Sequence, residues 1–279
     1  MMYLSSLLLC LFVYADVFSM TQNDRWDASN YVNNGVIQRI LGQKVAKQMG
    51  GYFDQTKCLL DVGCGDGFIS QYLAASVGSA VGIDSSLNMI NHASSKYKID
   101  NLQFKHCSIE QLQSLEEYDI ATAFFLLNYV SSIKTTLNRI YNALKSQGSF
   151  IATVWRNAPA DKFAFALNQA LAACGFKRDE NIYVPQINRK EDWVSELEQM
   201  GFSNIKVETC DYQHVFNDKE EFMKWVSFGP HSVNQINMVP QNREEEYYQK
   251  VVEKYLEYID YKGGAINFAY PAFLIIADK

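Results

Sequence analysis

The feature that most constrains this chain is a short segment in which an apolar run ends in an acid and then meets three closely spaced glycines. Cys58–Val62 is apolar apart from Asp61, and Gly63, Gly65 and Gly67 follow at every second position. A stretch with helical apolar spacing begins directly afterwards. This order predicts a buried strand, a tight turn and a helix start, an arrangement that holds nucleotide-like ligands at the carboxyl end of a parallel strand.

Helix and strand patterns alternate on both sides of that turn. Helical spacing of apolar residues covers 36–49, 68–77, 87–93 and 130–144. Strand-like patterns follow these helical ranges, at 80–84, 102–106, 118–124 and 149–155. Strands that alternate with helices form βαβ units, so we predict an α/β fold with a doubly wound, mostly parallel sheet and helices on both faces.

The pattern changes after residue 155. Helical spacing covers 158–174, 190–200, 219–228 and 243–258, and two long strand candidates occupy 204–216 and 265–277. We expect these strands to complete a seven-stranded sheet at its edge, with a helical lid, within 156–260, inserted after the fifth strand. No repeat or linker-like segment interrupts the chain, so 20–279 is predicted to be a single domain.

Composition narrows the classes of function. The chain has 279 residues, a net charge of −6 and a pI near 5.3, which argues against a broad nucleic-acid surface. Its six cysteines form no C-x-x-C pair and fit buried free thiols. The four histidines lack metal-ligand spacing, so no metal site is expected.

The first nineteen residues form a separate apolar segment. An uncharged run rich in Leu, Val, Phe and Tyr lies within it, and no Lys or Arg precedes that run. Three interpretations stay open: an over-extended start or loose apolar tail, a signal peptide or anchor, or a structured helix. The run is short for a membrane span, so we expect no stable membrane association. A cytoplasmic location is predicted.

The glycine turn alone fits several ligands, and it also fits a strand-to-helix corner that binds none. Glycine permits positive φ and lets a ligand approach the backbone. Asp84 ends the next predicted strand, seventeen residues after Gly67, where a carboxylate accepts hydrogen bonds from a ribose diol. A dinucleotide site of the G-x-G-x-x-G type would have its third glycine at position 68, which is Phe68 here.

Two motifs resemble those of the class I S-adenosylmethionine-dependent methyltransferases, which have a Rossmann-like fold. These are Leu-Asp-Val-Gly-Cys-Gly-Asp-Gly at 60–67 and Gly-Ile-Asp-Ser-Ser at 82–86, with Met89 after the second. The resemblance implies S-adenosylmethionine as the cofactor. It also implies the following cofactor-binding residues: Asp61, Gly63, Cys64, Gly65, Gly67, Asp84, Ser85, Met89, Ser108, Ile109 and Phe124.

The resemblance further implies a role for several of these residues. The backbone of the glycine turn would lie against the methionine part of the cofactor, and Asp61 would face its ammonium group through water. Asp84 would hold the ribose hydroxyls, and Met89 would pack near the adenine.

Two later segments extend the resemblance. Ser108 stands where the family commonly has an acid that accepts from the adenine amino group, and a hydroxyl accepts that bond more weakly. Ile109 would contact the adenine ring. Phe124 begins a segment similar to the family's motif after the fourth strand, whose first residues face the cofactor.

Candidates for the acceptor side follow from topology, because ligands bind beyond the carboxyl ends of the strands. These candidates are Asn128, Tyr129 and Trp155, together with Tyr31 from the entry segment. For Tyr129 and Trp155, ordinary packing in the core is an equal alternative. The sequence offers no clear general base, which favours a carboxylate acceptor since such a nucleophile needs none.

Function therefore reduces to a small number of hypotheses. The chain is predicted to methylate a small molecule, and its outer segments resemble methyltransferases of the trans-aconitate and malonyl-carrier-protein type. One alternative is methylation of a protein-borne acyl group or another macromolecule. Another is a non-catalytic protein that keeps the fold and the cofactor, and a nicotinamide or nucleotide-sugar enzyme is disfavoured by Phe68.

Overall fold

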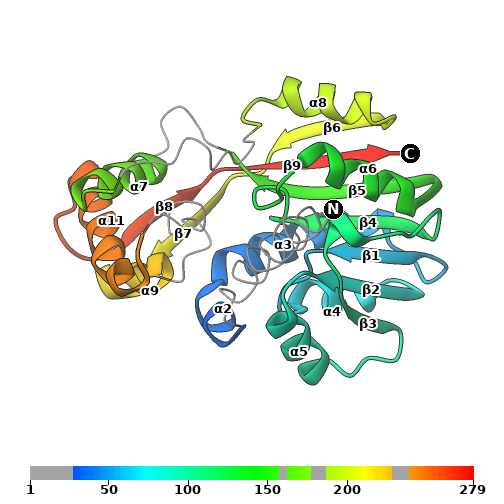
Figure 1. Ribbon diagram of the computed structural model, residues 1–279, viewed down its shortest axis with the longest axis horizontal. Helices are drawn as coiled ribbons and strands as arrows, with labels where there is room; N and C mark the ends of the chain where they lie inside the picture. Colours follow the sequence, from blue (N-terminus) through cyan, green and yellow to red (C-terminus); the bar gives the residue numbers. More distant parts are fainter. Residues whose placement is uncertain (1–27, 157–161, 177–186, 228–238) are drawn as a thin grey trace, which may run out of the picture.

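The computed structural model describes residues 28–156, 162–176, 187–227 and 239–279. Its centre is a seven-stranded sheet with the strand order β3-β2-β1-β4-β5-β9-β6 (Figure 1). This confirms the predicted doubly wound fold. The expectations for residues 1–19 concern a segment outside the described residues, so they and the expected compartment stay predictions.

The first five strands run parallel to one another, and the last two complete the edge in antiparallel pairs. β9 pairs antiparallel with both β5 and β6. The strands of this sheet are β1 (Cys58–Val62), β2 (Ser79–Asp84), β3 (Leu102–His106), β4 (Tyr118–Phe124), β5 (Leu144–Trp155), β6 (Ser203–Thr209) and β9 (Ala272–Asp278). The ranges predicted for β1, β3 and β4 are confirmed to the residue.

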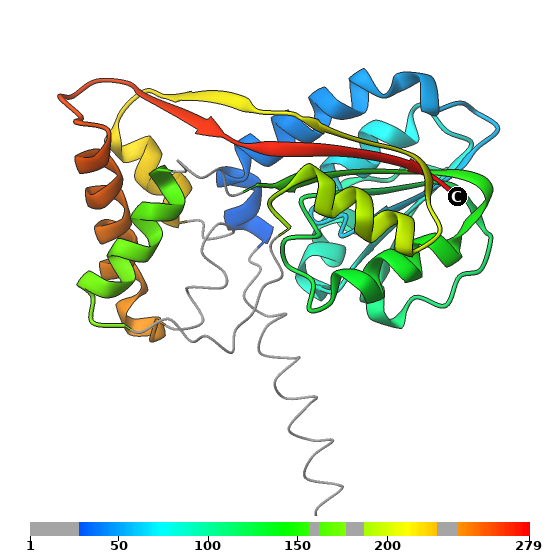
Figure 2. The same ribbon diagram turned by 90° about the horizontal axis from the view of Figure 1, so that it is seen from above.

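Helices cover both faces of the sheet (Figure 2). The side chain of Leu59 in β1 lies in the hydrophobic cluster shared with α3 and α4, whereas Leu60 lies in the cluster shared with α6 and α8. This alternation follows from the two-residue period of a strand. The helices of this part are α2 (Ala28–Asn34), α3 (Val36–Gln48), α4 (Phe68–Ala74), α5 (Leu87–Lys96), α6 (Ile133–Ala143) and α8 (Lys190–Gln199), with short 3-10 turns η1 (Gly50–Tyr52) and η2 (Ile109–Gln111).

The prediction of two long, continuous strands in the C-terminal part is wrong, because each range is divided into two shorter strands. The range 204–216 divides into β6 and β7 (Tyr212–Phe216), and 265–277 divides into β8 (Ile266–Tyr270) and β9. β7 and β8 pair with each other in a separate two-stranded sheet. The division occurs at Pro271, which has no N–H to donate to a ladder, and opposite it at Asp211, whose carboxylate accepts from the N–H of Ala272 at 3.2 Å.

Within the described residues, the β7–β8 pair carries three helices, and together they form what we call the outer module. The helices are α7 (Lys162–Ala173), α9 (Lys219–Ser227) and α11 (Glu244–Tyr258), the last preceded by the turn η4 (Gln241–Arg243). The outer module lies beside the main sheet, at the end of the extended β6–β7 and β8–β9 segments (Figures 1 and 2).

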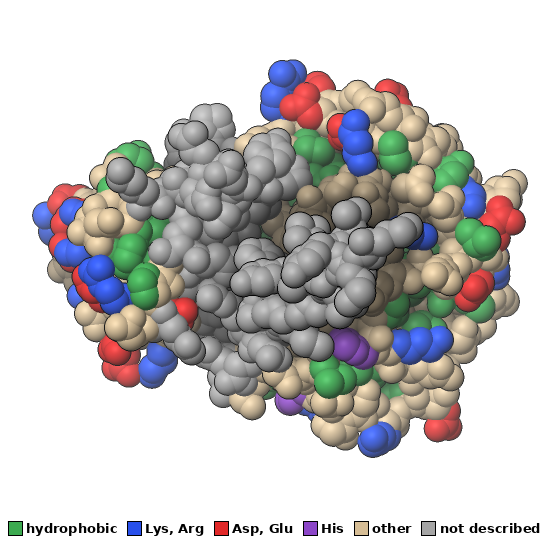
Figure 3. Space-filling view, viewed as in Figure 1, with side chains coloured by type: hydrophobic (Ala, Val, Ile, Leu, Met, Phe, Trp, Pro, Cys, Tyr) green, Lys and Arg blue, Asp and Glu red, His purple; other side chains and the backbone are tan. Residues whose placement is uncertain are grey.

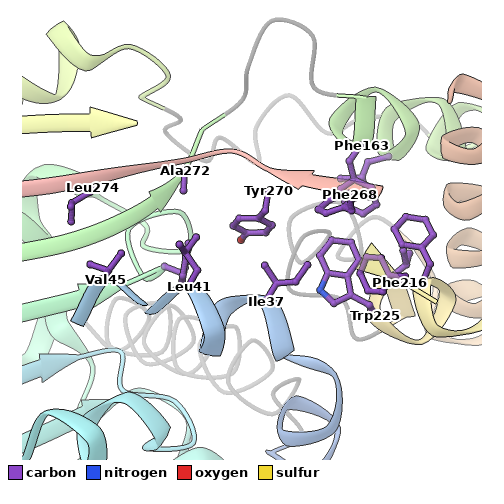
Figure 4. Packing of buried hydrophobic residues seen from close by; sticks show 14 of the residues in the cluster. Ile37, Leu41, Val45, Phe163, Phe216, Trp225, Phe268, Tyr270, Ala272 and Leu274 are labelled. Carbon is purple, nitrogen blue, oxygen red and sulfur yellow. The ribbon is translucent and has the colours of Figure 1, made fainter. Parts of the chain in front are cut away.

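The interior of the outer module is rich in aromatic residues. Phe222 is completely buried, and its ring centroid lies 5.9 Å from that of Trp225 and 6.0 Å from that of Phe268. Tyr270 connects this cluster to the main body, with Ile37 of α3 beneath it (Figure 4). One continuous apolar cluster therefore extends from the α3 face of the sheet into the outer module.

The surface of the outer module is strongly charged. Ion pairs along its helices join Lys224 to Glu220, Lys250 to Glu253 and Lys254 to Glu257. In Figure 3, acidic and basic side chains are interspersed at this end of the molecule. Such mixed charge is typical of a solvated face. Within the described residues, no helix is both long enough and apolar enough to cross a membrane.

Candidate active site

The candidate site lies at the topological switch point of the sheet, between the neighbouring strands β1 and β4. β1 has β2 on one side and β4 on the other, because the chain builds β2 and β3 outward on one side of β1 and then crosses back to place β4 and β5 on the other side. In open α/β sheets the crevice at the carboxyl ends of two such strands is where ligands bind. A pocket is found there, between the end of β1, the end of β4, and helices α2 and α3.

The glycine turn after β1 forms the floor of this pocket. Gly65 has φ of +54°, and a side chain added there would meet no atom within 4 Å. Gly67 has φ of +78°, but a side chain there would approach Phe104 to 2.6 Å. Gly65 is therefore the position at which the absence of a side chain opens space for a ligand, whereas Gly67 allows close packing against β3.

Asp61 lies beneath the turn and is almost fully buried. Its carboxylate accepts hydrogen bonds from the hydroxyls of Ser70, at 2.5 Å, and Thr122, at 2.8 Å. Burial raises the pKa of Asp61 to about 6, although both hydrogen bonds favour the ionised form. A buried carboxylate of this kind is prepared to receive a cationic group, which would lower its pKa again.

Asp84 ends β2 and organises the turn from the other side. Its two carboxylate oxygens accept from the backbone N–H groups of Gly65, at 2.9 Å, and Ser86, at 2.8 Å. Desolvation raises the pKa of Asp84, and these hydrogen bonds oppose the shift. The carboxylate thus fixes the glycine turn, and its remaining lone pairs are available to other donors.

An ion pair attaches the N-terminal helices to the glycine turn. The guanidinium of Arg39 in α3 contacts the carboxylate of Asp66, and it also donates to the carbonyl of Val32 at 3.1 Å. It lies over the ring of Phe68, with 4.6 Å from its central carbon to the ring centroid. Tyr31 of α2 lines the same pocket.

Aromatic residues form the wall nearest the outer module. Phe124 and Phe125 line the pocket at the end of β4. Phe125 has φ of +59°, a strained conformation for a bulky residue, and such strain is concentrated at functional sites. Its ring meets that of Tyr270 edge to face at 5.6 Å, and Tyr270 stacks on Trp155 at 5.4 Å. A row of rings thus leads from the pocket toward the outer module.

The structure brings together six of the residues predicted for the site. These line the pocket: Tyr31, Asp61, Gly63, Cys64, Gly65 and Phe124. Asp84 and Gly67 lie next to it through the turn. The remaining predicted cofactor residues, which do not line it, are Ser85, Met89, Ser108 and Ile109. Ser108 begins the η2 turn, and Met89 and Ile109 are buried.

Among the acceptor candidates, Asn128 has a structural task. Its side-chain amide donates to the carbonyl of Trp155 at 2.9 Å and accepts from the N–H of Trp155 at 2.8 Å. It therefore fixes the end of β5. Trp155 lies between the rings of Tyr270 and Phe163. Tyr129 is removed from solvent, and this burial raises the pKa of its phenol well above the usual value.

Several lining residues were missed by the sequence reasoning. They are Gln38, Arg39, Asp66, Phe68, Ile69 and Phe125. One signal was present in the sequence, because Gln38 precedes Leu41 and Val45 by three and seven residues. It is a polar residue in the apolar stripe of a helix, and such a residue needs a reason to be buried.

These residues fit S-adenosylmethionine. The open position at Gly65 accommodates close approach of a ligand to the backbone, and the carboxylates of Asp61 and Asp84 suit an ammonium group and a ribose diol. No group of three His, Cys, Asp or Glu side chains within the described ranges could hold a metal ion. The sheet order, the glycine turn and the acids at two strand ends define a class I S-adenosylmethionine-dependent methyltransferase.

The comparisons agree with this class. The chain belongs to the methyltransferase domain family, whose profile matches residues 36–207. The solved YcgJ protein of Bacillus subtilis superposes with a TM-score of 0.57 at 19% identity, over 87% of this chain and 97% of its own. Phosphoethanolamine N-methyltransferase 2 of Haemonchus contortus superposes with a TM-score of 0.58 at 16% identity, over 92% of this chain and 60% of its own. At these identities the solved structures show the shared fold alone.

Sequence relatives carry methyltransferase names. The 235L protein of Invertebrate iridescent virus 6, named as a methyltransferase, is 23% identical over 89% of this chain and 92% of its own length. A malonyl-[acyl-carrier protein] O-methyltransferase of Acetivibrio thermocellus is 22% identical, over 70% of this chain and 71% of its own. The juvenile hormone acid O-methyltransferase of Bombyx mori is 21% identical, over 70% and 72%. The chain is a methyltransferase that uses S-adenosylmethionine.

Proposed function

We propose that this enzyme methylates a small molecule through an oxygen of a carboxylate group. The observation that carries the proposal is the state of the protic groups in the pocket. No histidine is found among the described residues that line it. Removal from solvent raises the pKa of the Tyr31 phenol, which lines the pocket, further above its usual value, so its basic phenolate form is not accessible near pH 7.

The two carboxylates of the pocket are also engaged. Asp66 is paired with Arg39, and Asp61 accepts from two hydroxyls. An acceptor that must lose a proton before attack would find no free base among these groups. A carboxylate arrives already ionised and needs none. The names of the relatives from Acetivibrio thermocellus and Bombyx mori, both O-methyltransferases and the second named for an acid, support the same choice.

The cofactor residues take the following roles in this proposal. Gly63 to Gly67 hold the methionine part through their backbone, Asp61 attracts its ammonium group, and Asp84 accepts from the ribose hydroxyls. Met89, Ser108 and Ile109 belong to the adenine side. The bound cofactor supplies an electrophilic methyl group on a sulfonium centre.

The protein's own task is then positioning and exclusion of water. Phe124 and Phe125 form an apolar wall beside the pocket, and the rings of Tyr270 and Trp155 continue it toward the outer module. We propose that the outer module acts as the lid that receives the apolar part of the acceptor. The net charge of −6 supports a small acceptor over a nucleic acid.

A screen of acceptors tests the proposal. The purified full chain is given S-adenosylmethionine with a labelled methyl group and three panels: small carboxylic acids, phenols and amines, and malonyl groups on an acyl-carrier protein. We expect label in base-labile methyl esters of small acids. Label found solely in amines or phenols would contradict the carboxylate assignment, and label found solely in the carrier-protein panel would contradict the small-molecule assignment.

A further inference from the structure

Gln38 presents an unusual feature in the pocket wall. The residue is 6% exposed, yet neither its amide oxygen nor its amide nitrogen has a hydrogen-bond partner within the described part of the chain. It lines the pocket together with Asp61 and Gly63. A buried primary amide without partners destabilises a fold, so native proteins rarely keep one unless something else uses it.

The neighbouring Arg39 adds a second unpartnered donor. Its terminal nitrogens contact Asp66 and the carbonyl of Val32, but its buried Nε has no partner among the described residues. Two side chains that line the pocket therefore carry two donors, Gln38 Nε2 and Arg39 Nε, and one neutral acceptor, Gln38 Oε1, that have no partner among the described residues. The carboxylate of Asp61 lies on the same pocket.

This set of groups selects a particular ligand chemistry. Two neighbouring donors, one of them on a guanidinium group, are best matched by an anionic acceptor, and an amide oxygen beside a carboxylate is best matched by a cationic donor. A simple carboxylate would satisfy the donors and leave Oε1 unpaired. An α-amino-carboxylate satisfies both, because its carboxylate and its ammonium group are attached to one carbon atom.

We propose that Gln38 binds the amino-acid end of the methyl donor, with its nitrogen donating to the carboxylate and its oxygen accepting from the ammonium group. This inference rests on the proposed placement of the cofactor at the glycine turn. It assigns to α3 a direct part in cofactor recognition. The two unpaired atoms of Gln38 gain hydrogen-bond partners in the complex. The same side chain therefore lowers the folding stability of the free protein and raises its affinity for the cofactor.

Two cofactor fragments separate this role from others. S-Adenosylhomocysteine carries the amino-acid end, and 5′-methylthioadenosine lacks it. In the Gln38→Met variant, which keeps the length of the side chain and removes its polar atoms, titration calorimetry should show about ten- to hundredfold weaker binding of S-adenosylhomocysteine. Binding of 5′-methylthioadenosine should change by less than about twofold, since it makes no contact with the amide.

A matched control uses another buried polar group. Thr136 in α6 is completely buried, and its hydroxyl has no partner among the described residues, but it does not line the pocket. Thr136→Val should leave the binding of both fragments unchanged. In the absence of ligand, both variants should melt at the wild-type temperature or above it, because each removes an unpaired polar group. Gln38→Asn, which keeps the amide and shortens the side chain, should also weaken S-adenosylhomocysteine selectively.

Other outcomes would overturn the inference. Equal loss of both fragments in Gln38→Met would mean that Gln38 supports the site structurally. If Gln38→Met binds S-adenosylhomocysteine as the wild type does but has a raised KM for the acceptor, the amide of Gln38 contacts the acceptor and not the cofactor. If the wild type binds neither fragment, the cofactor placement itself fails. If Asp84→Ala weakens both fragments and Gln38→Met weakens neither, the cofactor site stands and the role of Gln38 is wrong.

Discussion

The glycine turn and the outer module are built on opposite principles. The turn uses backbone geometry and a few acids, and its three glycines have positive φ, which few other residue types adopt. Gly65 needs positive φ and an open side, and Asp84 accepts from two particular N–H groups. The outer module uses large apolar side chains, and Phe163, Phe216, Phe222, Trp225 and Phe268 fill its interior.

This difference explains why the sequence predicts the role of the glycine turn but not that of the outer module. A turn that depends on backbone conformation leaves a motif, because few residues can replace glycine at positive φ. An aromatic interior produces no sequence motif and shows only as a high content of aromatic residues, because apolar residues of similar volume can replace one another. The methyl donor is therefore recognised from a motif, whereas the outer module, which we propose receives the acceptor, has a sequence that carries little specific information.

The largest expected effect lies in the outer module. Phe222→Ala removes a completely buried ring that packs against Trp225 and Phe268, and should lower the free energy of unfolding by about 3–5 kcal/mol. Binding of S-adenosylhomocysteine to the folded variant should stay within about threefold of wild type, which calorimetry checks. Phe165→Ala, at an exposed position of α7, is the control and should cost less than about 1 kcal/mol. A large loss of cofactor affinity in Phe222→Ala would show that the two regions are not independent.

The next effect concerns Asp61 and pH. Its folded-state pKa, about 6, lies above the usual 3.8, so protonation favours the folded state. This contribution is present below about pH 4 and is lost as the pH rises through 6. Relative to Asp61→Asn, the wild type should therefore lose up to about 3 kcal/mol between pH 4 and pH 7, as measured by urea unfolding. Parallel stability curves for the two proteins would contradict the shifted pKa.

Binding of the cofactor should show the opposite dependence. If Asp61 receives the ammonium group, its ionised form binds better, so the affinity for S-adenosylhomocysteine should fall roughly tenfold from pH 7 to pH 5. In Asp61→Asn this fall should disappear. The same carboxylate thus destabilises the free site at neutral pH and strengthens the bound one.

A smaller effect on folding, with a large effect on binding, is expected at Gly65. Gly65→Ala places a side chain at φ of +54°, which should cost about 1–2 kcal/mol of folding stability. The added methyl group projects into the ligand space, so affinity for S-adenosylhomocysteine should fall at least tenfold. Gly50→Ala, where the side chain also meets open space but φ lies outside the left-handed region, is the matched control and should leave binding unchanged. Equal behaviour of the two variants would remove the glycine turn from the cofactor site.

The smallest effect lies at the junction between the two regions. Arg156, directly after β5, makes a two-pronged contact with Asp211, at 2.7 and 3.3 Å, between β6 and β7. Arg156→Lys keeps the charge but loses the planar fork, and should cost about 0.5–1 kcal/mol in thermal unfolding. A cost above about 2 kcal/mol would show that this junction, and not the aromatic cluster, holds the outer module in place.

Much of the fold could be predicted because its signals are local. The strands β1, β3 and β4 coincide with short strand-like patterns in the sequence, and the turn after β1 has its glycines at the required spacing. The division of the two C-terminal strands was not predicted because apolar residues continue on both sides of Pro271. The proline breaks the ladder, but the pattern of side chains does not change there.

The candidate site was predicted in part for a related reason. Acids and glycines with fixed backbone roles could be identified, but partners that come from another element could not. Asn128 was expected near the acceptor, and nothing in the sequence indicated that its side-chain amide donates to and accepts from the backbone of Trp155. Gln38 was overlooked because one polar residue in an amphipathic helix does not stand out. Its burial without partners is visible only once α3 is placed over the end of β1.

Hydrogen–deuterium exchange with and without S-adenosylhomocysteine tests the central claim most directly, because one experiment reports on both regions. If the glycine turn holds the methyl donor, added protection should concentrate in the backbone of 62–68 and 84–89, with the outer-module segments 212–227 and 244–258 unchanged. Protection confined to the outer-module segments, or no protection at saturating ligand, would contradict the assignment of the cofactor to the turn after β1.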